Sequence, residues 1–109
     1  MMTSADLENL RANTAAFPRT TPLFREAGLR TILLHLKPGE NMPEHQTRGA
    51  ILVHCLTGHG IFAAGDERTE LRPGILISVP PSAPHSVTAA AEQELLLLVA
   101  ISEQVTPVQ

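Results

Sequence analysis

The chain has 109 residues, of which eight are basic and eleven acidic, giving a formal net charge of −3. This length allows one domain with a single modest core. Hydrophobic residues make up 43% of the chain and aromatic residues only 3%, so we expect a core of Leu, Ile, Val and Ala. The charges are spread without runs, which excludes a strongly basic surface for nucleic acid or for an anionic membrane.

The sequence shows neither the pattern of a membrane-spanning helix nor that of a signal peptide. The longest apolar stretch, Leu95 to Ile101, is far shorter than a bilayer-spanning helix. The N-terminus lacks the basic-then-apolar order of a signal peptide, and the single cysteine, Cys55, excludes an internal disulfide framework. We therefore expect a cytoplasmic protein.

The N-terminal residues 1–22 are predicted to form a short helix and an extended arm. Thr3 and Asp6 have the spacing of a capping box, and Leu7 and Leu10 form a narrow apolar stripe. Two leucines are too few to stabilise a free helix, so we expect this segment to pack on the rest of the domain or on a partner subunit.

Residues 23–109 are predicted to form an all-β domain. Short apolar segments follow one another with Gly and Pro at the corners, and no helix pattern separates them. This is typical of an antiparallel sandwich or barrel. The expected strands are Leu23–Glu26, Leu29–Leu36, Met42–His45, Ala50–Leu56, Ile61–Ala64, Glu70–Leu71, Ile75–Val79, His85–Ala89 and Leu95–Ile101.

Two histidines far apart in the sequence occupy similar positions in this pattern. His45 follows a Pro-Gly turn, and His85 follows a glycine turn, an apolar strand and a proline-rich corner. His54 has the opposite parity to Ile51, Val53 and Cys55, because side chains alternate along a strand. A bulge at Gly49 would turn His54 toward the same cavity as His45, whereas without one His54 lies on the outer face.

These residues resemble the cupins, a family of small antiparallel jelly-roll barrels. The first cupin motif reads G-x5-H-x-H-x3-E-x6-G, and Gly39, His45 and Gly58 match it. The second reads G-x5-P-x-G-x2-H-x3-N and is matched by Gly74, Pro80 and His85. The resemblance covers roughly residues 29–101 and implies an antiparallel double-sheet jelly-roll barrel.

The departures from the motifs bear on metal binding. Metal-binding cupins hold Fe, Mn, Ni or Zn with three His and one Glu, but Thr47 and Ile51 stand at two of these positions here. Ser82 and Ala89 replace the Gly and Asn of the second motif. His45 and His85 remain, and a catalytic site usually needs three protein donors. If His54 or Gln46 turned inward, it would supply the third donor for one divalent ion.

Three functional hypotheses follow. The first is a binding domain that takes a small apolar or weakly acidic molecule in the barrel interior. The second is a metal-dependent oxygenase or isomerase that uses His45, His85 and a third donor such as His54. The third is a structural or oligomerisation role. The first is favoured, because loss of two donors weakens a metal site while leaving the cavity. The predicted cavity residues are His45, Thr47, Ile51, Val53, Cys55 and His85.

A homodimer is also predicted. The strands at 50–56 and 95–101 are apolar on both faces, which favours packing of a sheet against a second copy of the chain.

Overall fold

The computed structural model describes residues 2–12 and 19–103. In these residues one short helix, α1 (Leu7–Ala12), precedes nine strands. The strands are β1 (Thr20–Glu26), β2 (Leu29–Leu36), β3 (Asn41–His45), β4 (Ile51–Thr57), β5 (Gly60–Ala64), β6 (Glu67–Leu71), β7 (Leu76–Val79), β8 (His85–Ala89) and β9 (Leu95–Ser102).

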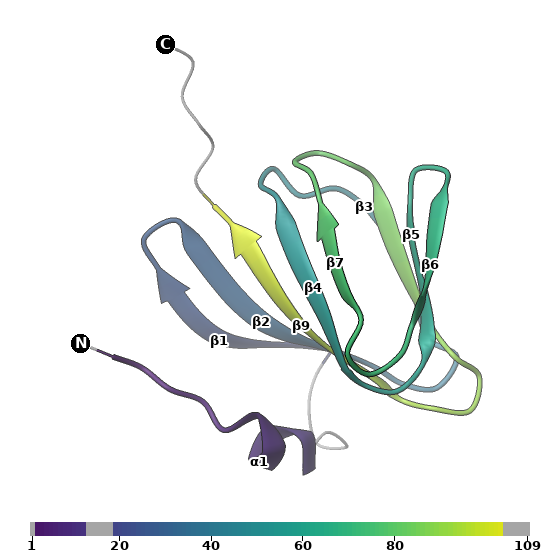
Figure 1. The fold of residues 1–109 in the computed structure, drawn as a ribbon, viewed down its shortest axis with the longest axis horizontal. Helices are drawn as coiled ribbons and strands as arrows, with labels where there is room; N and C mark the ends of the chain where they lie inside the picture. Colours follow the sequence, from purple (N-terminus) through teal and green to yellow (C-terminus); the bar gives the residue numbers. More distant parts are fainter. Residues whose placement is uncertain (1, 13–18, 104–109) are drawn as a thin grey trace.

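The strands of the described residues form two sheets that face one another (Figure 1). The five-stranded sheet has the order β1-β2-β9-β4-β7, and the four-stranded sheet has the order β3-β8-β5-β6. The paired strands run antiparallel in both sheets. The all-β, double-sheet jelly-roll fold predicted from the sequence is confirmed.

Two strands begin three residues earlier than predicted, and both lie at a sheet edge. β1 starts at Thr20 rather than Leu23, and Pro22 fits there because an edge strand leaves some backbone N–H groups unpaired. β6 starts at Glu67 rather than Glu70, across a tight turn from Ala64. Its first residues are polar and exposed, so they carry no apolar alternation.

The N-terminal helix is capped by a side chain. The backbone N–H of Asn9 donates a hydrogen bond of 3.1 Å to Oδ1 of Asp6, and the helix begins at the next residue, Leu7. Residues 13–18 of the predicted arm lie outside the described residues, and Thr20 to Pro22 belong to β1. Within residues 2–12 and 19–103, no helix has the length and apolarity needed to cross a membrane.

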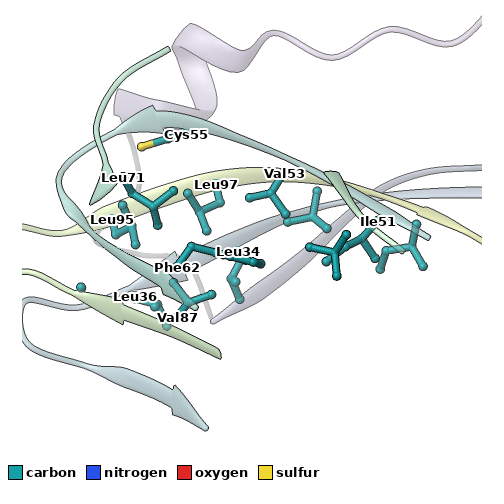
Figure 2. Packing of buried hydrophobic residues seen from close by; sticks show 14 residues of the cluster. Leu34, Leu36, Ile51, Val53, Cys55, Phe62, Leu71, Val87, Leu95 and Leu97 are labelled. Atoms are coloured by element: carbon teal, nitrogen blue, oxygen red, sulfur yellow. The ribbon is translucent and has the colours of Figure 1, made fainter. Parts of the chain in front are cut away.

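The core lies between the two sheets. Along β4 and β8, and along β9 from Leu97 onward, the side chains alternate between buried and less buried positions, as expected for strands with one face inward. Figure 2 shows the packed side chains, with Cys55, Leu71 and Leu95 toward one end of the cluster and Ile51 toward the other.

The outer face of the five-stranded sheet also carries apolar side chains. Leu52 on β4 and Leu76 on β7 are 45% and 61% exposed. His54 is half-buried on this face and pairs with Leu76 across the strands. The homodimer remains a prediction, and this face is the surface on which it depends. A monomer mass from light scattering at micromolar concentration would contradict it.

Candidate functional site

His45 and His85 come together on the inner face of the four-stranded sheet. His45 ends β3 and His85 begins β8, and the two residues are direct partners in the antiparallel register. Their ring centroids lie 4.3 Å apart, with the rings at 62° in an edge-to-face arrangement. Pairing of β3 with β8 therefore brings together the two histidines that are far apart in the sequence.

The two rings differ in exposure and in surroundings. His85 is 2% exposed and stacks on Phe62 of β5, with ring centroids 5.8 Å apart, whereas His45 is exposed. Each ring has its Nδ1 near a backbone carbonyl oxygen: that of Ala83 at 3.0 Å for His85, and that of Pro43 at 3.2 Å for His45. A carbonyl oxygen only accepts, so we assign the proton to Nδ1 and acceptor character to Nε2 in the neutral rings.

The electrostatic environment keeps His85 neutral. Burial is the main cause that lowers the pKa of His85 below 6.5. The hydrogen bond to Ala83 opposes this shift, and the charge of a protonated His45 would add to it. At neutral pH His85 therefore offers a hydrogen-bond acceptor rather than a positive charge.

A cavity of about 280 Å³ lies between the sheets beside this histidine pair. Most of its lining is apolar and includes Ile51 and Val53 of β4 and Val99 of β9. The polar lining consists of Thr20, Arg30, His45, Thr47 and His85. The cavity thus joins an apolar interior to a small set of polar groups, which is the usual composition of a small-molecule site.

Five of the predicted cavity residues line this cavity, namely His45, Thr47, Ile51, Val53 and His85. The sixth, Cys55, does not. Its side chain is fully buried at the other end of the core, near Leu71 (Figure 2). Its Sγ lies 3.7 Å from the carbonyl oxygen of Thr57. Burial raises the pKa of the Cys55 thiol to about 11, which disfavours a nucleophilic role.

His54 does not join His45 and His85, so the predicted group of three histidines is not formed. The register of β4 runs without a shift from Ile51 to Cys55, and the bulge in β4 lies between Cys55 and Thr57, after His54. Strand alternation therefore leaves His54 on the outer face. Gly49 lies before β4 and does not form the predicted bulge. A glycine is needed at this position because a Cβ there would overlap the carbonyl oxygen of Ser102.

Arg30 is a cavity residue that sequence reasoning did not select. It lies on β2 and shares its strand face with Ile32 and Leu34, which also line the cavity. The alternation along β2 contained this information, because an arginine on an otherwise apolar inward face is unusual.

A family model described as a cupin domain matches residues 32–101. The chain belongs to the cupin family. No curated protein matches this cupin.

Solved structures share this fold. TT1209 from Thermus thermophilus is 27% identical, with a TM-score of 0.77 over 93% of this chain and 97% of that protein. A cupin superfamily protein from Desulfitobacterium hafniense is 19% identical, with a TM-score of 0.71 over 78% of this chain and 76% of its own. An RmlC-like cupin from Methanocaldococcus jannaschii is 17% identical, with a TM-score of 0.69 over 76% of this chain and 77% of that protein. The last two likenesses concern the fold alone.

The residues present do not fit the metal centre that the cupin motifs describe. Thr47, at the position of the second histidine, donates its hydroxyl to the carbonyl oxygen of Gly49 at 3.0 Å. Ile51, at the position of the glutamate, has no donor atom in its side chain. Among residues 2–12 and 19–103, no group of three or more His, Cys, Asp or Glu side chains is placed to hold a metal ion. Two imidazoles alone fall short of the usual three protein donors.

Proposed function

We propose that this cupin binds a small organic molecule, with a mainly apolar body and one polar or weakly acidic end, in the cavity between its sheets. The observation that carries the proposal is the meeting of His45 and His85, 4.3 Å apart, at an apolar cavity of about 280 Å³. Apolar pockets with a few convergent polar groups are typical ligand sites.

The chemistry of His85 indicates which polar group suits this site. Its Nδ1–H is used by the carbonyl oxygen of Ala83, and burial keeps the ring neutral. The remaining nitrogen, Nε2, is therefore an acceptor. A ligand hydroxyl, such as that of a phenol, would donate its hydrogen to this nitrogen.

The volume of the cavity limits the size of the ligand. A dry engineered cavity of about 150 Å³ binds benzene, and ordinary ligand pockets begin near 300 Å³. At about 280 Å³ the cavity is suited to a molecule with one aromatic ring or a short alkyl chain. We therefore choose p-cresol as the first probe.

The test compares two substitutions at neighbouring positions of β4. Val53→Phe places a larger side chain in the cavity, whereas Leu52→Phe makes the same addition on the outer face. At ten times its Kd, p-cresol should stabilise the wild-type protein by roughly 1.4 kcal/mol, a rise in melting temperature of roughly 5 °C or more. Leu52→Phe should keep this rise, and Val53→Phe should lose it.

Two results would contradict the proposal. One is an equal response of Val53→Phe and wild type, or the absence of any response in wild type. The other is stoichiometric Fe, Mn, Ni or Zn in protein purified without added metal, lost in a variant carrying both His45→Ala and His85→Ala. That result would favour the metal-dependent enzyme.

A further inference from the structure

A second hollow adjoins the mouth of the cavity. It has a volume of about 480 Å³ and shares Arg30, Thr47 and Ile101 with the cavity lining. Its other charged lining residues are Arg48, in the segment between β3 and β4, and Glu103, just after β9. A molecule that enters the cavity from this side passes the side chain of Arg30.

This mouth is positively charged, although the chain as a whole has a formal charge of −3. Arg25 on β1 and Arg30 on β2 are direct cross-strand partners, and like charges in this position repel. Arg48 lines the same hollow, and Glu103 is its acidic lining residue. The guanidinium groups of Arg25 and Arg30 share the carboxylate of Glu103, and Arg48 adds a further positive charge to the lining of the hollow, so the local charge favours an anion.

Glu103 does not satisfy both arginines. Arg25 donates two hydrogen bonds to it, from Nε to Oε1 at 3.2 Å and from a terminal nitrogen to Oε2 at 2.6 Å. Nε of Arg30 lies 3.6 Å from Oε2, which is beyond hydrogen-bond distance. Within the described residues this Nε is the one buried side-chain nitrogen or oxygen atom of a non-exposed residue that has no hydrogen-bond partner.

A buried donor without a partner is rare in folded proteins, because it loses its hydrogen bonds to water on folding and forms none within the protein. The side chain of Arg30 is nevertheless 40% exposed, so part of it remains accessible from the mouth. The residue thus combines an unused donor, a fixed positive charge and a position on the wall of an apolar cavity.

We infer that the ligand is an organic carboxylate whose negative end is bound by Arg30 while its apolar body lies in the cavity. This inference rests on the proposed function and names the class of ligand. The planar guanidinium group matches the two oxygens of a carboxylate, and such charge-assisted hydrogen bonds are stronger than neutral ones. Arg30 stands on the five-stranded sheet and the histidine pair on the four-stranded sheet, so polar side chains line both walls of the cavity.

The test uses two probes that have nearly the same shape and differ in charge. Phenylacetate and phenylacetamide are titrated into the full chain by calorimetry at neutral pH and low salt. Wild type should bind phenylacetate more tightly than the amide. Arg30→Gln should weaken phenylacetate binding by roughly 10- to 100-fold, the range for a hydrogen bond to a charged group, and leave the amide nearly unchanged.

Two further variants control for structural effects. Arg72→Gln removes an exposed arginine that lines neither hollow, so both affinities should stay at the wild-type values. Glu103→Gln removes the carboxylate that competes for the guanidinium groups, so it should tighten phenylacetate binding. A merely structural Arg30 would not produce opposite changes in Arg30→Gln and Glu103→Gln.

The outcomes separate this inference from the proposed function. If both probes bind wild type and Arg30→Gln changes neither affinity, the cavity still binds ligands but the carboxylate role of Arg30 is wrong. If neither probe binds wild type at millimolar concentration, the carboxylate inference is wrong, and the proposed function fails with it only if p-cresol does not bind either. Loss of both probes in a folded Arg30→Gln protein would also contradict charge recognition, because the neutral amide does not need it.

Discussion

The two ends of the β-sandwich differ in packing, although the same strands run through both. On β2 the inward positions lead from Arg30 at the open end to Leu36 at the closed end, where the side chain is fully buried. On β9 the exposure falls in the same direction, from 8% at Ile101 to 0% at Leu95. Strand alternation sets which face is inward at both ends, and the types of residue decide whether that face is filled or left as a cavity.

The largest expected effect is on stability. It is tested by comparing the loss of unfolding free energy when two leucines on the same face of β2 are each replaced by alanine. Leu36→Ala removes a side chain from the closed end and should lower the free energy of unfolding by about 4 kcal/mol. Leu34→Ala removes one that already borders the cavity, so fewer contacts are lost and the expected decrease is about 2 kcal/mol. Denaturant titrations of both variants measure the difference. An equal or larger effect of Leu34→Ala would mean that the open end is packed as tightly as the closed end.

The second prediction concerns the thiol at the closed end. Because burial raises the pKa of Cys55 from 9.0 to about 11, the fraction present as thiolate is about 100-fold lower than for an ordinary cysteine. Iodoacetamide at pH 8 should therefore alkylate the folded protein at least about 100-fold more slowly than the chain unfolded in denaturant. Similar alkylation rates for the folded and unfolded protein would show that Cys55 is accessible. The closed end would then not be more tightly packed than the open end.

These two predictions depend on a fold that the sequence largely reveals. Alternation and turn residues located β4 and β9 to within a residue or two, because one face of each strand is buried and glycines or polar residues flank it. The starts of β1 and β6 were not predicted. Both strands lie at sheet edges, where exposed polar residues or a proline are tolerated and the apolar signal is weak.

The site was only partly predictable. The spacing of His45 and His85 in the cupin motifs pointed to their meeting, but the face of His54 depended on where β4 is bulged, which is set by its partner β9. The alternation along β2 places Arg30 on the inward face, but its unpartnered Nε depends on Glu103 and Arg25, which come close to it only when β1, β2 and β9 pair. Contacts of this kind leave no local pattern in the sequence.

The third prediction is a smaller, pH-dependent effect at the open end. The folded protein lowers the pKa of His85 below its ordinary value of 6.5, so the unfolded chain binds this proton more readily. The contribution to stability is therefore present above pH 6.5 and is lost as the pH falls from 6.5 toward the lowered value in the folded state. His85→Gln should show a shallower decline of unfolding free energy over this range. A decline as steep as in wild type would assign the pH dependence to other groups.

The most direct test of the binding site is a titration of isotope-labelled protein with p-cresol, followed through the methyl resonances by NMR. If the cavity binds the probe, the methyl signals of Ile51, Val53 and Val99 should shift in a saturable manner, while those of Leu36, Leu71 and Leu95 should stay in place. Saturable shifts confined to Leu52 and Leu76 on the outer face, or no shifts at all, would contradict the account.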